Sequence, residues 1–319
     1  MISLFRLAAL FLLVAGPMAG ADADPAALLK AGKADQAIHS LNLAIARAPN
    51  DARSYNLLCR VYYQLEVWDD AVRTCEKAVN LEPPSSYYHL WLGRAMGRKA
   101  EVANPFTAFN LARKVKIEFE RAITLDGNNL SARSDLSEFY LEAPGFLGGD
   151  KNKAKQQADY VAEHDRALGS YIYARVAEKQ GNTGAEAEYK KAIAASSQPA
   201  RYWVELAHFY RRTGRMGEME DAIRHALGTV HEGEPSEFDA AALLVHSGRD
   251  FAGAAQMLRH YVSVQDTAED GPPFRAHYLL GVVLEKQGKK KEAAAEFQSA
   301  LNIASEYRPA QDALARVSR

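Results

Sequence analysis

The sequence is short of cysteine, of net charge and of long hydrophobic runs, and each shortage narrows the possible classes of protein. Two cysteines, Cys59 and Cys75, cannot make a disulfide framework, so the fold must rest on a hydrophobic core. A formal net charge of −1 over 319 residues removes the long-range attraction that brings basic proteins to nucleic acids or anionic membranes. We therefore expect no nucleic-acid partner.

Patterns that carry chemistry are also missing. No Cys-x-x-Cys, His-Glu-x-x-His or Gly-x-Ser-x-Gly pattern occurs, which leaves no zinc site or nucleophile elbow to argue. Glu205 and His208 could share a helix face at i and i+3, but their spacing supplies no third or fourth metal ligand. We predict that the protein is not an enzyme and that it needs no cofactor and no metal.

The glycine-rich segment before Lys151 superficially resembles a phosphate-binding loop. Asp150 separates its last glycine from Lys151, and the sequence on both sides is helical, whereas a phosphate loop joins a strand to a helix. We interpret the segment as a lengthened turn, in which Pro144 ends one helix and Asp150 caps the next.

The hydrophobic run at the N-terminus has the layout of a signal peptide. Arg6 precedes the apolar run Leu7–Ala15, and alanines at spacing two follow it, as an A-x-A cleavage site requires. An uncleaved anchor is the alternative, but the run is shorter than the roughly 20 residues of a bilayer span. We predict a signal peptide over residues 1–23, cleavage within 21–23, export to the periplasm or an equivalent space, and no membrane span in the mature chain.

What the sequence does contain is a repeat. Ala37, Ala44 and Pro49 recur 34 residues later as Ala71, Ala78 and Pro83. In the second copy the marks are Tyr55, Leu58, Tyr62, Ala71, Cys75, Ala78 and Pro83. These marks resemble the tetratricopeptide repeat (TPR) family, whose pattern is W-x2-L-G-x2-Y followed by A-x3-F, A and P.

The resemblance implies an all-α, right-handed α-solenoid of helix-turn-helix repeats, in which small residues let paired helices approach closely. The predicted organisation is a signal peptide (1–23) and one TPR solenoid (24–319), with a partial repeat (25–51), full repeats at about 52–85, 86–129, 130–166, 167–199, 200–233, 234–273 and 274–307, and a capping helix (309–318). Gly214, Gly248 and Gly288 stand where first helices should end in a left-handed cap.

Three copies depart from this register, and the fifth does so least, because its turn is one residue short. In the third, Phe119 and Ala122 arrive about ten residues late, which we interpret as an insertion at Ala100–Ala108. In the fourth, the turn over residues 144–150 is lengthened. The Gly-Gly-Asp-x-x-Lys-Ala sequence at this turn is similar to one in periplasmic TPR components associated with solute transporters. That similarity supports an alternative function, as an accessory component of a solute-transport or envelope-assembly system that contacts a small ligand.

In the TPR family, four positions of each first helix point into a concave groove. Mapping these positions predicts a peptide-binding groove lined by Arg53, Asn56, Arg60, Tyr63, Tyr87, Arg94, Tyr171, Arg175, Arg201, His208, Arg211, Arg275 and Tyr278. Arg and Tyr are enriched at binding hot spots, and Arg grips carboxylates with two donors. The first hypothesis is therefore a protein-protein interaction scaffold with a locally basic groove for an acidic peptide or protein partner; solvated helix faces are the alternative interpretation.

Cys59 and Cys75 fall in the same repeat, at similar heights on its two antiparallel helices. An oxidising compartment would allow a disulfide between them. Two buried, reduced thiols that fill the core are the alternative. The sequence does not decide between the disulfide and the two reduced thiols.

Overall fold

The computed structural model describes residues 23–231, 234–264 and 269–319, so almost the whole predicted signal peptide lies outside the described residues. In chain order the helices are α1 (Pro25–Lys30), α2 (Ala34–Arg47), α3 (Ala52–Gln64), α4 (Trp68–Leu81), α5 (Ser86–Val102), α6 (Pro105–Leu125), α7 (Leu130–Glu142), the short 3-10 helix η1 (Gly145–Leu147), α8 (Lys151–His164), α9 (Arg166–Lys179), α10 (Ala185–Ala195), α11 (Pro199–Arg212), α12 (Met216–Leu227), α13 (Pro235–Ser247), α14 (Phe251–Ser263), α15 (Pro273–Lys286), α16 (Lys290–Ile303) and α17 (Arg308–Val317).

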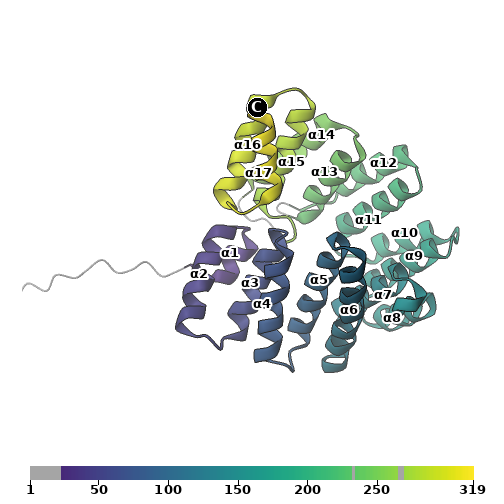
Figure 1. The fold of residues 1–319 in the computed structure, drawn as a ribbon. Helices are drawn as coiled ribbons and strands as arrows, with labels where there is room; N and C mark the ends of the chain where they lie inside the picture. Colours follow the sequence, from purple (N-terminus) through teal and green to yellow (C-terminus); the bar gives the residue numbers. More distant parts are fainter. Residues whose placement is uncertain (1–22, 232–233, 265–268) are drawn as a thin grey trace, which may run out of the picture.

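These helices pack as consecutive antiparallel hairpins that wind into a solenoid (Figure 1). Along the array, first helices of neighbouring hairpins touch one another, as α3 touches α5, α7 touches α9 and α11 touches α13. The first helices therefore make one continuous layer. The part of the chain that the structure describes contains no strand, and the predicted all-α solenoid is confirmed.

Close approach of paired helices depends on small residues, as the repeat pattern implied. A Cβ atom added to Gly93 on α5 would lie 2.5 Å from Cε1 of Phe119 on α6. On α15, a Cβ atom at Gly281 would lie 2.5 Å from Cε1 of Phe297 on α16. Such distances leave no room for a side chain, so the glycine and the ring define the height at which each hairpin closes.

The late arrival of Phe119 has a helical explanation. α5 has 17 residues and α6 has 21, whereas α15 and α16 have 14 each. The inserted residues therefore lengthen both helices of the hairpin, and Asn104 caps α6 by accepting a hydrogen bond from Thr107 N at 3.1 Å. The extra turns project beyond the neighbouring hairpins rather than forming a loop.

The lengthened turn of the fourth repeat contains η1. Asp150 caps α8 by accepting hydrogen bonds from Asn152 N at 2.8 Å and Lys153 N at 3.2 Å. Gly148 has φ of +99°, a conformation that side chains disfavour. The segment is a turn between two helices, which agrees with its interpretation from the sequence.

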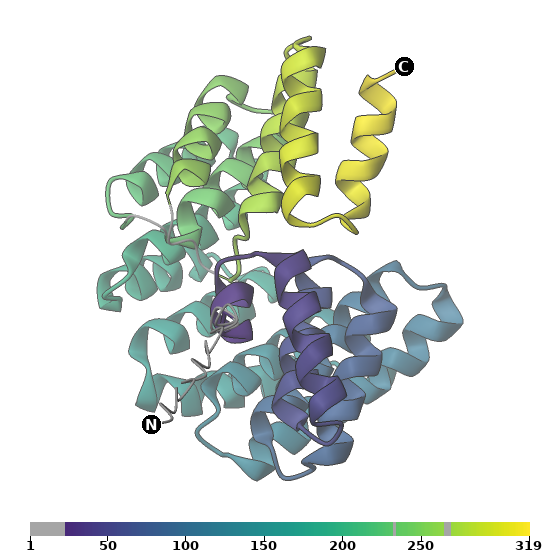
Figure 2. The same cartoon turned by 90° about the vertical axis from the view of Figure 1, so that its left-hand side faces the viewer.

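The two ends of the solenoid meet. Leu29 and Leu41 share one buried cluster with Phe274 and Tyr307, which come from the other end of the chain. Figures 1 and 2 both show α15–α17 lying against α1–α3. Burial of these apolar side chains is the main force that holds the ends together.

Polar contacts reinforce this closure. Gln64 Nε2 donates to the carbonyl oxygens of Leu29 at 3.3 Å and Glu269 at 2.9 Å. The carboxylate of Asp35 accepts a hydrogen bond from Ser305 N at 3.0 Å. The solenoid is therefore a closed turn around a central hollow.

Cys59 on α3 and Cys75 on α4 form a disulfide, with their Cα atoms 5.2 Å apart. Both residues are fully buried. The disulfide joins the two helices of the second repeat. Its cysteines are 16 residues apart, as Gly281 and Phe297 are in the α15–α16 hairpin, so the bond occupies the position at which that glycine and ring meet.

Candidate functional site

The first group of predicted groove residues gathers around Trp91, a buried residue of α5. The guanidinium of Arg60 lies 5.1 Å from the centre of the Trp91 ring, and that of Arg94 lies 5.0 Å from it. Tyr63 and Tyr87 contact the same ring edge to face at 5.5 and 6.4 Å. Side chains from α3 and α5 thus build one aromatic and cationic cluster.

Both arginines of this cluster already have acidic partners in the chain. Arg60 Nε donates to Glu269 at 2.8 Å, across the closure between the two ends. Arg94 Nε donates to Asp135 of α7 at 2.6 Å. The positive charge that the sequence placed here is therefore largely neutralised within the molecule.

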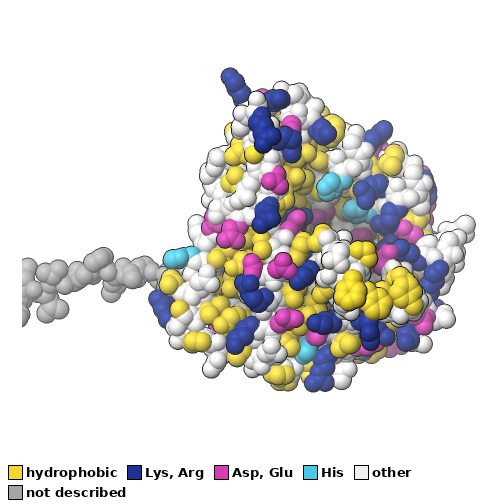
Figure 3. Space-filling view, viewed as in Figure 1, with side chains coloured by type: hydrophobic (Ala, Val, Ile, Leu, Met, Phe, Trp, Pro, Cys, Tyr) yellow, Lys and Arg dark blue, Asp and Glu magenta, His cyan; other side chains and the backbone are white. Residues whose placement is uncertain are grey.

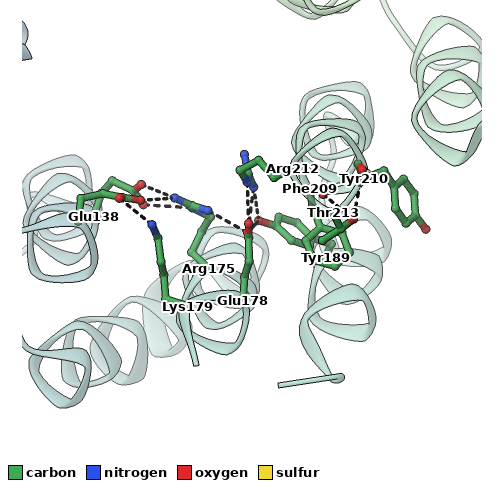
Figure 4. Close-up of polar contacts among 10 residues, drawn as sticks. Glu138, Arg175, Glu178, Lys179, Tyr189, Phe209, Tyr210, Arg212 and Thr213 are labelled. Carbon is green, nitrogen blue, oxygen red and sulfur yellow. Dashed lines mark hydrogen bonds and ion pairs between the residues drawn. The ribbon is translucent and has the colours of Figure 1, made fainter. Parts of the chain in front are cut away.

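The second group is an ion-pair network centred on Arg175 of α9, drawn in Figure 4. The Arg175 guanidinium donates to Glu138 at 2.5 Å, Glu142 at 3.0 Å and Glu178 at 2.9 Å. Arg212 of α11 donates to the same Glu178 at 2.6 Å. Three successive first helices, α7, α9 and α11, are thereby linked by charge-assisted hydrogen bonds.

Burial alone would favour the uncharged forms of Arg175 and Glu178, but their ion-pair partners favour the charged forms more strongly. Desolvation lowers the pKa of Arg175, yet the hydrogen bond and charge of Glu138 raise it above the ordinary arginine value. Burial likewise raises the pKa of Glu178, while Arg212 and Arg175 bring it below its usual value. The groups stay ionised, so the network stabilises the fold and does not transfer protons.

The third group lines a cavity of about 410 Å³ in the central hollow. Its walls come from α11, α13 and α15 and from the chain ends that close the solenoid. The lining residues include Glu66, His208, Asp239, His246, Asp270, Arg275 and Tyr278. Figure 3 shows the surface drawn in between these helices, with histidine side chains at the recess.

Charges of both signs face this cavity. Burial, together with the nearby charges of Arg212 and Arg211, lowers the pKa of His208 to about 4. Asp239 reaches the water of the hollow, but the surrounding walls, together with Glu205 and Asp270, raise its pKa to about 7. The cavity therefore has a cationic region near α11 and an acidic region near α13.

The remaining predicted residues lie at the margins of these groups. Arg53 is exposed at the start of α3, while Asn56 is buried, and its Nδ2 finds no hydrogen-bond partner among the described residues. Tyr171 packs against the rings of Tyr189 and Tyr202. Arg201 lies over the Tyr202 ring at 5.6 Å. Arg211 makes no ion pair within the described residues.

Sequence reasoning missed Trp91, Asp135, Asp239, His246 and Glu269. Asp239 and His246 could have been found, because they are polar residues seven apart on the apolar helix α13 and so share one face. Asp135 and Glu269 become visible only when the superhelix brings distant repeats together. Among the described residues, no group of three or more His, Cys, Asp or Glu is placed to hold a metal ion.

Models of the tetratricopeptide repeat family match residues 28–94, 200–228 and 238–309. These matches agree with the hairpin packing of the helices. The chain is a tetratricopeptide repeat protein. In the part of this TPR protein that the structure describes, no helix combines the length and apolar character needed to cross a bilayer.

Solved TPR structures resemble the chain at low identity. A thermophilic TPR protein from Thermus thermophilus is 17% identical, with 56% of this chain and 90% of that chain covered and a TM-score of 0.47. A TPR protein from Parabacteroides merdae is 14% identical, with 92% and 96% covered and a TM-score of 0.40. The human IFIT1 dimer is 15% identical, with 86% and 69% covered and a TM-score of 0.43.

Proposed function

We propose that this TPR protein is a non-catalytic, exported scaffold that binds an acidic segment of a partner protein inside its central hollow, against α11. The TPR fold supports a protein-protein interaction scaffold in general. The observation that carries the finer proposal is the distribution of unpaired cations over the inner helices.

In the N-terminal half of the hollow, Arg60, Arg94 and Arg175 each hold a carboxylate of the same chain. On α11 the balance is different, because Arg201 and Arg211 make no ion pair within the described residues. Burial is the main cause of the lowered pKa of His208 in the same region, and the charges of Arg212 and Arg211 act in the same direction. Within α11, Glu205 interacts with the charge of Arg201. The counter-charge that the chain does not provide is that of Arg211, and a carboxylate of a partner would supply it.

The test uses the double variant Arg201→Ala/Arg211→Ala, with Arg259→Ala on the outer helix α14 as the matched control. Pull-down from a periplasmic extract of the native host should recover the partner with wild type and Arg259→Ala, and at least about tenfold less with the double variant. Equal recovery with the double variant would sink the proposal. Arg60, Arg94 and Arg175 are unsuitable targets, because their reversal would set carboxylate against carboxylate.

A titration of His208 by NMR gives a second reading of the same site. An anionic segment that binds beside His208 would offset the charges of Arg211 and Arg212 and so raise the pKa of His208. An uncharged segment would only bury the imidazole further and lower this pKa, which would contradict the proposal.

Export is part of the proposal and rests on the layout of residues 1–23. N-terminal sequencing of the mature protein from a periplasmic fraction should place the first residue just after a cleavage within 21–23. Recovery of the intact chain from the cytosol would contradict it.

The cavity of about 410 Å³ favours a second candidate function, because this volume is in the range of small-molecule sites. In that case the protein would serve as an accessory component of a solute-transport or envelope-assembly system, holding a small ligand between the cationic and acidic regions. Native mass spectrometry separates the two candidates: a co-purified small molecule favours transport, and an empty cavity with a bound peptide favours the scaffold.

A further inference from the structure

The two larger departures from the repeat register meet at one place on the outer surface. Phe109, from the lengthened α6, stacks on Phe146, from the lengthened turn, with ring centres 6.3 Å apart and planes inclined by 17°. Phe146 is 80% exposed and Phe106, one turn from Phe109, is 78% exposed. Figure 3 shows hydrophobic side chains gathered in this region, where Figure 1 places α6, α7 and α8.

The exposed residues form a stripe along α6. Phe106, Phe109 and Ile117 follow the spacing i, i+3 and i+11, which puts them on one face of the helix. The opposite face is buried through Leu111, Val115 and Phe119. We call the stripe together with Phe146 the aromatic platform.

A cavity of about 460 Å³ lies on the other side of α6. Val115 and Phe119, from the buried face of that helix, line it, and so do the carboxylates of Asp135, Glu138 and Glu142. This cavity is therefore separate from the platform, which stands on the exposed face of α6.

Exposed cations lie along α6 beside the platform. Arg113, Lys114 and Arg121 are exposed on the outer side of α6 and make no ion pair within the described residues. The two glutamates of α6 are engaged elsewhere: Glu118 contacts His89 Nδ1 at 2.5 Å, and Glu120 accepts from the Tyr140 hydroxyl at 3.1 Å. Arg113, at i+7 from Phe106, therefore lies within the stripe between Phe109 and Ile117, and Lys114 and Arg121 lie beside it.

From this combination we propose that the aromatic platform is a second binding site, which docks an acidic amphipathic helix of a partner protein. A stripe at helical spacing, about 16 Å long at 1.5 Å per residue, matches the apolar face of another helix. The flanking cations select glutamate and aspartate beside that face. A second copy of this chain fits poorly, because two α6 helices would set like charges against each other. This proposal is independent of the hollow.

The probe is a synthetic, fluorescein-labelled helix about 20 residues long, with leucine at i, i+3, i+7 and i+11 and glutamate at the flanking positions. Its binding to the full chain is followed by fluorescence anisotropy. We expect saturable binding that weakens as salt rises, because exposed charges are screened. A peptide with lysine in place of glutamate should bind at least about tenfold more weakly.

Two variants locate the binding. Phe106→Ser/Phe146→Ser and Arg113→Glu/Lys114→Glu should each lower the affinity at least about tenfold. Leu43→Ser, which changes an exposed apolar residue of α2, is the matched control and should have no effect. Circular dichroism should show unchanged helix content, because the substituted side chains are exposed.

Three results would overturn the proposal. The first is that the peptide does not bind, or that it binds the platform variants as tightly as the wild-type protein. The second is binding to vesicles of phosphatidylcholine with phosphatidylglycerol, but not to the peptide, that is lost in the platform variants; this would make the platform a lipid-binding surface. The third is a concentration-dependent dimer in light scattering that the platform variants abolish, which would make it a self-association surface.

Discussion

The third and eighth repeats share one internal design and differ in their outer surface. Gly93 meets Phe119 as Gly281 meets Phe297. His89 contacts Glu118 at 2.5 Å as His277 contacts Glu296 at 2.7 Å. In the third repeat both pairs are ten residues further apart in sequence, 26 against 16 and 29 against 19. The insertion therefore leaves the core contacts in place.

This difference shows at which end a TPR hairpin can gain residues without a change in its core contacts. Inserted residues that extend both helices beyond the glycine and the ring keep these two groups at the same height, so packing with the neighbours is preserved. The added turns have no neighbouring hairpin to cover them, and their outer side chains remain exposed. In this protein the added residues expose the apolar side chains of Val102 and Phe106, which suits a binding surface.

The largest effect should come from the shared core contact. Phe119→Ala and Phe297→Ala should each cost about 3–5 kcal/mol of stability, because both rings are buried against glycine and no side chain can fill the space. Urea denaturation followed by circular dichroism measures both. If Phe119→Ala costs less than half as much as Phe297→Ala, the two repeats are not equivalent.

The second repeat extends the comparison, because the Cys59–Cys75 disulfide takes the place of the glycine and the ring. Reduction should lower stability by about 3 kcal/mol, the value expected for a closed loop of this size. Thermal melts with and without dithiothreitol test this. The variant Cys59→Gly/Cys75→Phe, which installs the pair of the eighth repeat, should melt identically in both buffers. A wild-type melt unaffected by reductant would show that the bond contributes nothing.

The contact between His89 and Glu118 should have a smaller, pH-dependent effect on stability. The hydrogen bond that His89 Nδ1 donates to the Glu118 carboxylate raises the pKa of His89 above 6.5, although burial opposes the shift. The unfolded chain releases this proton at lower pH than the folded one, so the contribution is full below about pH 6.5 and is lost as pH rises through the folded pKa.

Glu118→Gln should therefore cost about 1 kcal/mol at pH 6 and less at pH 9. Urea midpoints at the two pH values provide the measurement, and Glu296→Gln serves as the counterpart in the eighth repeat. A loss that grows with pH would contradict the assignment of the stabilising charge to His89.

The smallest effect should appear where the repeats differ. Phe106→Ser removes a ring that is 78% exposed, so stability should change by no more than about 0.5 kcal/mol. The same denaturation assay compares it with Phe119→Ala, a phenylalanine of the same helix. A loss above about 2 kcal/mol would mean that the overhang belongs to the core and is not an added surface.

The spacing of residues within single repeats predicted much of this structure. Gly214, Gly248 and Gly288 adopt positive φ at the ends of α11, α13 and α15, as expected from their places in the repeat. The C-terminal segment forms α17, which packs on α16. Each of these features depends on residues within one or two repeats, so a pattern read along the chain can predict it.

The repeat pattern predicted less of the candidate site. Mapping of groove positions selected Arg60 and Arg94, but not the carboxylates that hold them. Glu269 is 209 residues from Arg60, and the two meet only because the ends of the solenoid close. Small rotations between successive repeats accumulate over the array, and the sequence pattern of one repeat does not contain their sum.

The helical hairpins, their order and their caps could be predicted from the amino-acid sequence, because they follow from contacts between residues close along the chain. The three-dimensional arrangement was needed to show which arginine side chains of α11 lack an ion-pair partner among the described residues, and that the two irregular segments join in one aromatic platform. Both depend on distances between separate repeats. Burial of the chain ends against each other sets those distances, and with them the hollow in which the proposed partner would bind.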